Sequence, residues 1–578
     1  MNILSIALLA VGITFLLGVI YFNRKKLYDY LNRNKNKIIA VSTGVSLLAG
    51  ATTTVFIPEG YMPNTLTRIR CSDGNIYDFN AANLLTVITA SNRTIELPAG
   101  TIELSSLPIN MTNLNNISIR GQGINVTNIR LASGAANNQY EHMFNLSNCH
   151  NIEFYGITFD FNNWSQSDTI TGTSSSEEKN LSVIMMRDYC SHIRIHDCSF
   201  WNGHGSFISS RSTSPTNNMS IYRCDFFDKR KMWWDGAINL AGSDNIVSDV
   251  YIEDMFACGI RIHGQPSSPQ PTRNIITRAT ITGDIGHGIH LENTNGNNIF
   301  ECNIFNINST SYNNWDAGGK PYSTGIYVGG STHRSYNNKI MYCSVRNVGY
   351  IGIGANGGYN DNNTVIGCSV SEVWNNSMIV LGSWNIISGN HLFTSNAKLG
   401  NYPLYGIRCI SHNTITENII NATGTARFGM GIYTRGILNH IGMNTLNNSY
   451  TAIRVDANLN TIEGNMITST ASGAPAILLK SANFTLVLHN NMDKIDRGIR
   501  IYRSCNTTCK DNIIGDAAAG YSIYEDTALC TFNIFRDNDY SDSTTKQATI
   551  IGSGSNEIQV NATTQKIGIQ TYVGWLWK

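Results

Sequence analysis

Charged side chains, prolines and basic clusters are scarce in this chain. Asp, Glu, Lys and Arg make up 14% of its 578 residues, and only 11 residues are proline. This charge content is well below the quarter that is typical of soluble domains. The formal net charge is +1, and no basic tract lies beyond the N-terminal segment. Because nucleic acids are bound by strongly basic surfaces, we expect no nucleic-acid partner.

Two long uncharged runs lie at the N-terminus. Segments 3–22 and 38–57 are each long enough to span a bilayer. The loop 23–37 between them sets Arg24, Lys25, Lys26, Arg33, Lys35 and Lys37 against one acid, Asp29. By the positive-inside rule this loop faces the cytoplasm or a virion interior, and the rest of the chain lies outside. Segment 38–57 could instead be a cleaved, signal-like segment, which also exports the large domain, or a buried core helix.

A short pattern recurs from about residue 200 onward: a small residue, an isoleucine, a variable residue and an apolar one. It reads GAINL, GIRI, GIHL, GIYV and so on, with its isoleucines at Ile238, Ile260, Ile289, Ile326, Ile353, Ile379, Ile407, Ile432, Ile453, Ile477, Ile499 and Ile523. Alternating apolar residues indicate strands, and spacings of 21 to 37 residues indicate a solenoid. We therefore predict a parallel β-helix with these isoleucines in one inward column.

Asparagine and cysteine follow the same repeat. Gly and Asn are abundant and suit the sharp corners of such coils, and stacked Asn side chains can hydrogen-bond along the axis. Cys198, Cys224, Cys302, Cys343 and Cys368 share one slot, which later coils fill with Asn390, Asn418, Asn444, Asn465 and Asn512. A column of buried thiols is favoured over disulfides or a metal site, although the 13 cysteines fit an exported, disulfide-bonded protein at first sight. CNTTC at 505–509 is weak evidence for zinc, and we expect neither a metal nor a cofactor.

The stretch TIELPAGTIELSS at 94–106 follows YDFNAANLLTVITAS. Together they resemble the opening of the pectate-lyase-like superfamily of right-handed parallel β-helices, which includes polygalacturonases, pectate lyases and bacteriophage tailspikes. The resemblance covers roughly residues 75–540 and implies an all-β, single-stranded right-handed β-helix. The chain then divides into a membrane anchor (1–57), a β-helix with its N-terminal cap (58–540) and a C-terminal tail or cap (541–578).

The stretch GDIGHGIHLEN at 283–293 could be part of an active site, and it is also one unit of the repeat. Alternation points His290 and Glu292 outward and puts His287 in the turn before the strand. The candidate catalytic residues are Asp235, Glu292, His263 and His290, and the candidate substrate-binding residues are Arg261, His287, Asn239, Tyr327, Trp233 and Trp234. The outward column continues through Arg408, Tyr433, Arg454, Arg500 and Tyr524, which suits a polyhydroxylated or acidic chain. Such residues are also common on any solvated strand.

The resemblance to polygalacturonases is incomplete at this site. Gly286, His287 and Gly288 match their Gly-His-Gly element, and Asp235 matches the end of their Asn-Thr-Asp element. The Asp-Asp and Arg-Ile-Lys elements are missing, and a second Gly-His-Gly at 203–205 shows that the tripeptide suits this repeat.

Three functions follow from these observations. The first is a polysaccharide hydrolase using Asp235 and Glu292, or a lyase in which Arg261 neutralises a uronate. The second is a non-catalytic spike or adhesin that binds a glycan receptor on a cell or a membrane-containing virion, and the third is an architectural shell component. The expected partners are a polysaccharide or glycan and the membrane, and a homotrimer is left open as the assembly.

Overall fold

The computed structural model describes most of the chain after residue 66. The described residues are 67–105, 108–133, 142–162, 182–203, 205–211, 213–227, 236–255, 257–265, 269–283, 285–307, 323–329, 334–354, 360–373, 377–395, 405–423, 426–515, 517, 521–527, 529–540, 548–551, 553–561, 566–571 and 574–577. Within them, no helix is long and apolar enough to cross a membrane. The hydrophobic segments 3–22 and 38–57, together with Trp233, Trp234 and Asp235, lie outside these residues.

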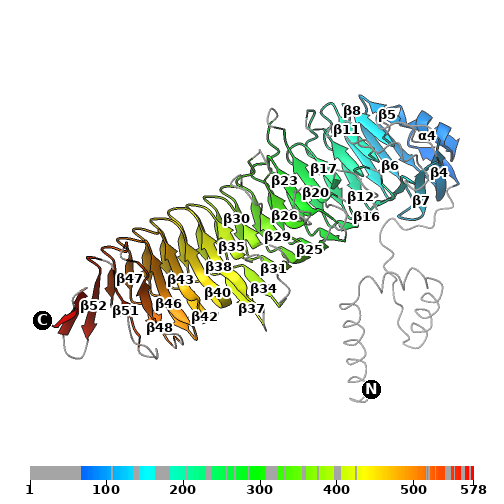
Figure 1. Cartoon of the computed structure of the whole chain (residues 1–578). Helices are drawn as coiled ribbons and strands as arrows, with labels where there is room; N and C mark the ends of the chain where they lie inside the picture. Colours follow the sequence, from blue (N-terminus) through cyan, green and yellow to red (C-terminus); the bar gives the residue numbers. More distant parts are fainter. Residues whose placement is uncertain are drawn as a thin grey trace, which may run out of the picture. The chain divides into compact units, whose positions relative to one another are not determined.

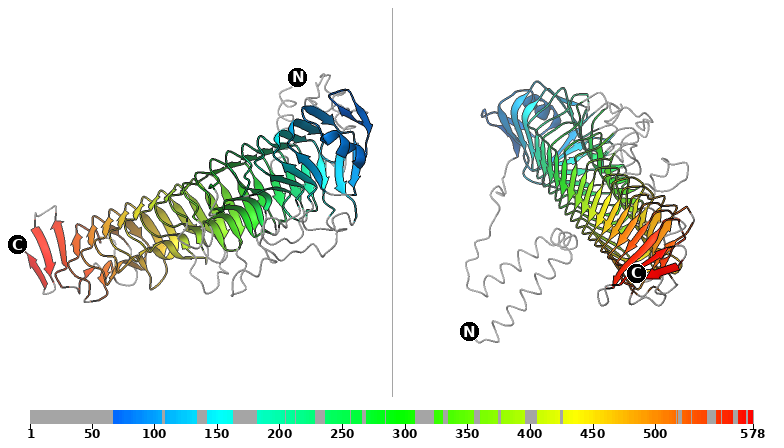
Figure 2. Two further views of the ribbon diagram at one scale, coloured as in Figure 1. Left: turned by 90° about the horizontal axis from the view of Figure 1, so that it is seen from above. Right: turned by 90° about the vertical axis from the view of Figure 1, so that its left-hand side faces the viewer.

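The described residues wind into a stack of coils, and the main body of each coil supplies strands to three parallel columns (Figures 1 and 2). Column 1 contains β3 (Arg93–Glu96), β6 (Asn115–Arg120), β9 (His150–Tyr155), β12 (Arg194–His196), β15 (Ser220–Tyr222), β18 (Ile246–Ser248), β21 (Ile275–Thr277), β24 (Asn298–Phe300), β27 (Lys339–Met341), β30 (Thr364–Ile366), β33 (Ile386–Ser388), β36 (Thr414–Thr416), β39 (His440–Gly442), β41 (Thr461–Glu463), β44 (Leu486–Leu488), β47 (Thr508–Lys510), β50 (Ile534–Arg536) and β52 (Asn556–Asn561).

Column 2 follows column 1 along the chain within each coil. It contains β4 (Gly100–Leu104), β7 (Thr127–Leu131), β10 (Thr158–Asp160), β13 (Ser199–Trp201), β16 (Asp225–Phe227), β19 (Tyr251–Glu253), β22 (Thr280–Thr282), β25 (Asn303–Ile307), β28 (Ser344–Val348), β31 (Ser369–Val373), β34 (His391–Thr394), β37 (Ile419–Ala422), β40 (Thr445–Val455), β42 (Met466–Thr470), β45 (Asn491–Asp493) and β48 (Ile513–Ile514).

Column 3 carries the recurring isoleucine pattern. It contains β5 (Ile109–Thr112), β8 (Phe144–Ser147), β11 (Ile184–Arg187), β14 (Ile208–Ser210), β17 (Gly236–Leu240), β20 (Cys258–His263), β23 (His287–Glu292), β26 (Thr324–Val328), β29 (Ile351–Gly354), β32 (Ser377–Val380), β35 (Tyr405–Cys409), β38 (Phe428–Thr434), the second half of β40, β43 (Pro475–Lys480), β46 (Arg497–Tyr502), β49 (Ile523–Glu525) and β51 (Ala548–Thr549).

The predicted isoleucine column is confirmed. All twelve isoleucines, from Ile238 to Ile523, are register partners on successive strands of column 3. Each of them is at most 1% exposed. Because one coil is too thin to enclose a core, each apolar face becomes buried only when its neighbours stack on it.

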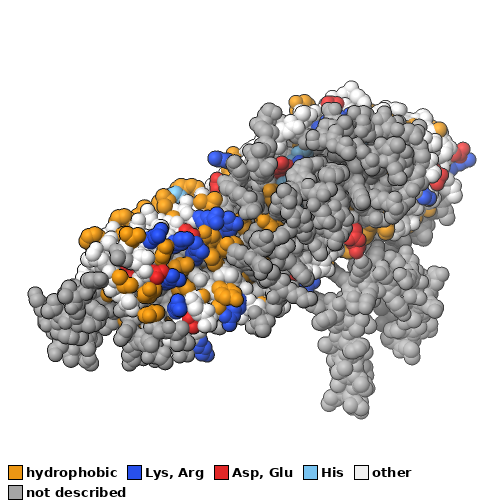
Figure 3. Space-filling model, in the orientation of Figure 1, with side chains coloured by type: hydrophobic (Ala, Val, Ile, Leu, Met, Phe, Trp, Pro, Cys, Tyr) orange, Lys and Arg blue, Asp and Glu red, His pale blue; other side chains and the backbone are white. Residues whose placement is uncertain are grey.

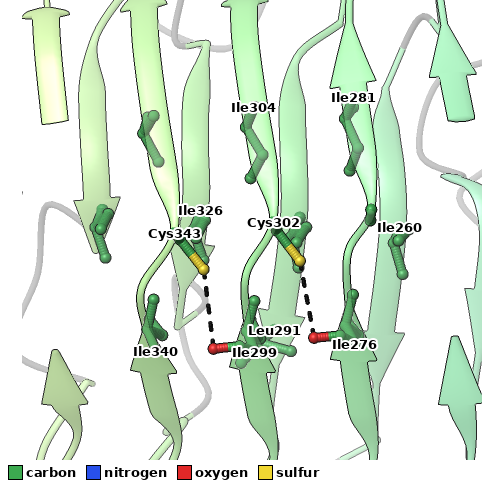
Figure 4. Close-up of a cluster of buried hydrophobic side chains, with 14 of the residues drawn as sticks. Ile260, Ile276, Ile281, Leu291, Ile299, Cys302, Ile304, Ile326, Ile340 and Cys343 are labelled. Atoms are coloured by element: carbon green, nitrogen blue, oxygen red, sulfur yellow. Dashed lines mark hydrogen bonds between the residues drawn. The ribbon is translucent and has the colours of Figure 1, made fainter. Parts of the chain in front are cut away.

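The shared slot for cysteine and asparagine is confirmed as well. Figure 4 shows Cys302 and Cys343, whose thiols donate to the backbone oxygens of Ile276 and Ile299 at 3.7 and 3.9 Å. From residue 390 onward asparagine takes over this role, and the Nδ2 of Asn390 donates to Val365 O at 3.0 Å. All thirteen cysteines lie in the described part of the chain and are free thiols, so the disulfide alternative is not what the fold uses.

Apart from the shared slot for cysteine and asparagine, a ladder of stacked asparagine side chains lines the corner before column 1. Successive side chains donate from Nδ2 to the next Oδ1 at 2.9 to 3.1 Å, through the pairs Asn274–Asn297, Asn297–Asn338, Asn338–Asn363, Asn385–Asn413, Asn413–Asn439 and Asn439–Asn460. These amides are almost fully buried, so the ladder satisfies polar groups that would otherwise be costly. The predicted hydrogen bonding of Asn along the axis is therefore present.

The residue just before this ladder has a left-handed backbone in most coils. Early coils place Asn218, Asp244 and Asn362 there, residue types that tolerate positive φ. Later coils use bulky apolar residues at φ of 53 to 63°: Trp384, Leu438, Leu459, Phe484 and Phe532. Their side chains are 46 to 61% exposed. The expectation that Gly and Asn form the corners thus holds in part: Asn506 has positive φ in a late coil, but Arg273 occupies this corner in an early one.

Both ends of the β-helix carry extra elements. At the N-terminal end, β1 (Arg68–Cys71) pairs antiparallel with β2 (Ile76–Asp78) and β3. Helix α4 (Ala81–Ile88) begins at Asn80, whose side chain accepts from the Asn83 amide at 2.9 Å, and it buries its apolar face against the core. At the other end, β52 pairs antiparallel with β53 (Lys566–Thr571), which pairs with β54 (Gly574–Trp577).

Candidate functional site on column 3

The candidate residues lie on three successive strands, β20, β23 and β26. Arg261, His290 and Tyr327 are register partners, and His263 is opposite Glu292. Because Ile260, Ile289 and Ile326 point inward, these side chains occupy the outward positions, as alternation along a strand requires. The structure therefore brings together five of the predicted residues that come from different coils.

Arg261 and Glu292 form an ion pair across neighbouring coils. The Arg261 Nη2 lies 2.7 Å from Glu292 Oε2, and the two side chains are only 12% and 23% exposed. Burial alone would raise the pKa of Glu292. The positive charge of Arg261 and its hydrogen bond outweigh burial and lower this pKa to about 2. Glu292 is therefore an ionised hydrogen-bond acceptor at neutral pH.

Two imidazoles and a phenol form an aromatic cluster beside this pair. The ring centroids of His287 and Tyr327 are 4.7 Å apart, and those of His290 and Tyr327 are 4.8 Å apart. Burial lowers the pKa of His290 to about 4 and that of His287 well below its usual value. Burial also raises the pKa of Tyr327. All three rings are therefore neutral at pH 7.

The sequence-based placement of His287 in a turn was wrong. His287 is the first residue of β23 and is opposite Cys258 and Thr324. A Cβ on Gly288 would lie 2.6 Å from both Gly325 O and Ile304 Cγ2, so only glycine fits there. Both Gly288 and Ile289 are buried. The strict alternation therefore fails between them, and His287 comes to lie beside His290.

Two predicted residues are less accessible than expected. Both His263 and Asn239 are 2% exposed, although each occupies an outward register position. Asn239 Nδ2 lies 3.5 Å from Ser209 Oγ on the preceding coil. Neither side chain is open to solvent, so neither offers a free binding surface. The other predicted residues, Trp233, Trp234 and Asp235, lie outside the described residues.

Sequence reasoning missed two partners of His290. Its Nδ1 lies 3.8 Å from the sulfur of Cys258, and its Nε2 lies 3.4 Å from Gly329 O. Because the cysteines were interpreted as buried structural thiols, Cys258 was not considered as a partner of His290. Its position two residues before Ile260 puts it in the same register as His287, and this spacing could have revealed it.

Comparison with known proteins found a family model and several solved structures of low identity. Residues 184–324 match a family model described as a right handed beta helix region. A tailspike protein of E. coli bacteriophage HK620, in complex with pentasaccharide, has 11% identity and a TM-score of 0.35, covering 84% of this chain and 78% of the tailspike. DFA-IIIase from Arthrobacter chlorophenolicus A6 has 12% identity and a TM-score of 0.33, covering 60% and 84%. The periplasmic alginate epimerase AlgG has 13% identity and a TM-score of 0.33, covering 69% and 85%.

The chain is a right-handed parallel β-helix protein, as the opening motif and the repeat predict.

Proposed function

We propose that this protein binds a polysaccharide on the outer face of column 3, at the cluster of Arg261, Glu292, His287, His290 and Tyr327. One observation supports the proposal. A buried ion pair and three aromatic rings from successive coils meet on one outward face. Saccharides are held by such combinations, because charged groups bond hydroxyls while ring faces stack on sugar rings.

Cleavage of the bound chain is the second candidate function, because a carboxylate and two imidazoles lie together on this face. Glu292 remains ionised, so it would accept a proton or attack, and it would not donate to a leaving oxygen. His290 is neutral, so its imidazole can accept a proton. In a hydrolase, Asp235 would supply the acid. In a lyase, His290 would remove the proton next to a uronate carboxylate that Arg261 neutralises.

The test uses the full-length protein in detergent and a panel of neutral and acidic polysaccharides. Binding is measured by isothermal titration calorimetry, hydrolysis by new reducing ends, and lyase activity by the ultraviolet absorbance of unsaturated products. We expect Glu292→Gln and Arg261→Ala to weaken binding about 10-fold or more, because each removes one partner of a buried, charge-assisted pair. Turnover by the wild type that falls about 10²-fold in Glu292→Gln would establish an enzyme.

Arg278→Ala is the matched control. Arg278 also pairs with a carboxylate at 2.7 Å, that of Asp249, but on an exposed corner away from column 3. This variant should bind and act like the wild type. Binding without turnover would favour a spike or adhesin. Unchanged binding and turnover in Glu292→Gln and Arg261→Ala, with both variants folded, would refute the site.

The N-terminal segments suggest where this surface is displayed. We propose that segments 3–22 and 38–57 anchor the protein, that loop 23–37 faces inward and that the β-helix faces outward. A membrane-impermeant maleimide tests this topology, because twelve native cysteines are buried and Cys505 is partly buried. In intact cells or virions Thr414→Cys should be labelled and Asn34→Cys should not. The reverse pattern would contradict the proposed orientation.

A further inference from the structure

The corner before column 1 changes its chemistry along the β-helix. The corner residue lies two positions before the register partners that open the strands of column 1. On seven coils up to residue 362 it is polar or glycine: His192, Asn218, Asp244, Arg273, Gly296, Asn337 and Asn362. On the next seven coils it is Trp384, His412, Leu438, Leu459, Phe484, Asn506 and Phe532. Five of these last seven are therefore large and apolar.

The backbone at this corner does not favour such residues. The φ angle lies between 52 and 67° at all fourteen positions, a region that glycine and asparagine tolerate better than bulky side chains do. The five large side chains do not gain burial in return, because they are 46 to 61% exposed. Strained backbone that carries exposed apolar side chains is typical of a surface with a function outside the fold itself.

Further exposed apolar side chains lie beside these five. Three are at the outward positions that open column 1 strands, and two precede the corner residues. Together they form what we call the apolar ridge: Trp384, Ile386, Ile410, Ile437, Leu438, Leu459, Phe484, Leu486, Phe532 and Ile534. The five added side chains are 38 to 45% exposed.

The apolar ridge is large for a surface left in water. Since adjacent strands are ~4.8 Å apart, its seven coils span about 30 Å along the axis. A half-exposed aromatic side chain offers roughly 100 Å², so the ten residues offer on the order of 800 Å². The largest apolar patch of a typical monomer is about 300–600 Å². The size of the apolar ridge therefore indicates an interaction surface.

The charges beside the apolar ridge that are open to solvent on the side of column 3 are basic. Arg435, Lys480 and Arg503 are exposed and lie three or four residues before a corner residue. The two carboxylates in the same segments, Asp456 and Asp526, are each 19% exposed and form ion pairs with arginines of column 3. Figure 3 shows apolar side chains, with Lys and Arg side chains beside them, where Figure 1 labels strands β38 to β47.

On the opposite side, within column 1, the basic residues are paired. Lys510 Nζ lies 3.1 Å from an oxygen of Asp511, and Arg536 Nε lies 3.0 Å from an oxygen of Asp537. The acid Glu463 lies 3.5 Å from His489. The basic residues on the column 3 side therefore give the apolar ridge its local charge.

This combination favours a lipid surface over a second copy of the chain. Two copies packed ridge to ridge would bring the basic residues of one opposite those of the other, whether parallel or antiparallel, and like charges repel. A lipid interface accepts projecting Trp, Phe and Leu side chains without needing a complementary shape. Anionic headgroups would also neutralise Arg435, Lys480 and Arg503.

We propose that the apolar ridge inserts into the interface of an anionic lipid bilayer, so that the C-terminal half of the β-helix lies along the membrane surface. The polar corners of the N-terminal half would stay in water. The inference goes beyond the proposed function, because the ridge requires no saccharide and does not depend on segments 3–22 and 38–57 being an anchor.

The test places a fluorophore on the ridge of the full-length protein, mixed with phosphatidylcholine vesicles that contain or lack phosphatidylserine. Twelve native cysteines are buried, so Cys505→Ser leaves an added cysteine as the accessible thiol. An environment-sensitive dye at Leu459→Cys should shift its emission to the blue and be quenched by nitroxide-labelled lipid. The effect should need phosphatidylserine and weaken as salt is raised. Asn362→Cys, at the same corner on a polar coil, is the matched position and should show neither change.

Ridge variants then test which side chains bind. With the dye at Leu459→Cys, Phe484→Ser/Phe532→Ser should lower the ratio of docked to undocked protein about 10-fold or more, because two aromatic side chains no longer enter the lipid. Tyr189→Ser/Tyr342→Ser is the control. It removes two aromatic side chains that are 65% and 64% exposed and also have positive φ, but that lie outside the ridge. This variant should dock like the wild type.

Four outcomes would overturn the proposal: equal dye signals at Leu459→Cys and Asn362→Cys, unchanged docking of folded Phe484→Ser/Phe532→Ser, equal docking without phosphatidylserine, or a blue shift without vesicles that grows with protein concentration. The last would show that a second copy covers the ridge. Arg261→Ala separates the two proposals, because it removes part of the saccharide cluster and should dock normally. Loss of saccharide binding in Arg261→Ala leaves the ridge intact, and loss of docking in the ridge variant leaves the proposed function intact.

Discussion

At the scale of single residues, the cluster on β20, β23 and β26 is held together by groups whose protonation is fixed by burial. His290 gains its neutral form from desolvation, and Glu292 keeps its charge because Arg261 is in contact with it. A neutral base next to a permanent carboxylate can bind hydroxyl groups without changing its own charge. The free energy of unfolding should therefore depend on pH.

The first prediction concerns His290. Its pKa is about 4 in the folded chain, compared with about 6.5 when unfolded, so the unfolded state binds more protons between these values. Stability is full above pH 6.5 and falls as pH drops to 4, by on the order of 3 kcal/mol for this group. His290→Gln should remove this part of the loss in denaturant unfolding measured across the window. His391→Gln, on an exposed side chain, should not.

A second residue-scale prediction concerns the buried amides. Asn465 Oδ1 accepts from both the backbone N–H and the Nδ2 of Asn444, at 3.0 and 2.9 Å. Asn465→Ala would leave the Asn444 backbone N–H without an acceptor, although Asn444 Nδ2 keeps its bond to Ile415 O, and it should lower the free energy of unfolding by about 3 kcal/mol. Cys302→Ala, which removes only a weak thiol bond from the same column, should cost about 1 kcal/mol. Equal losses in chemical denaturation would show that the amide ladder contributes no more than packing.

At the scale of strands and corners, the isoleucine column tests whether the repeat forms the core. Ile432 is 0% exposed and lies between Ile407 and Ile453. Ile432→Asp would bury an unpaired charge and should abolish folding. Ile432→Val removes one methylene and should cost only about 1 kcal/mol. Soluble, protease-resistant Ile432→Asp protein would contradict the column.

At the corners we predict a substitution that stabilises the fold. Leu438 has φ of 57° and is 48% exposed, so its backbone is strained while its side chain gains little from burial. Leu438→Asn should therefore stabilise the fold by about 0.5–1 kcal/mol, because asparagine tolerates this conformation. Ile441→Asn, at a fully buried strand position nearby, should destabilise it strongly. A lower melting temperature for Leu438→Asn would mean that the exposed leucine contributes to stability after all.

The sequence predicts the elements better than it predicts the site. The isoleucine and cysteine columns could be predicted because every coil repeats the same inward pattern. The contact between Arg261 and Glu292 could not be derived in the same way. It depends on the register of two strands separated by an irregular connection and on the side-chain rotamers. Likewise, the sequence pattern placed His287 in a turn, because it does not show that the strand begins at His287 and buries both Gly288 and Ile289.

At the scale of the β-helix, each coil contacts mainly its neighbours, so a whole coil should be removable. Ile453 follows Ile432 by 21 residues, and the same offset separates Asn439 from Asn460 and Asn444 from Asn465. Deleting residues 433–453 therefore keeps the three columns in register. The shortened protein should retain its β-rich circular dichroism and its resistance to protease, because solenoid stability is close to a sum of repeat and interface contributions.

Deletion of residues 433–443 is the control for this prediction. It removes about half a coil, shifts the inward residues out of register and should give unfolded or insoluble protein. If both deletions fail equally, the coils do not stabilise one another as interchangeable units.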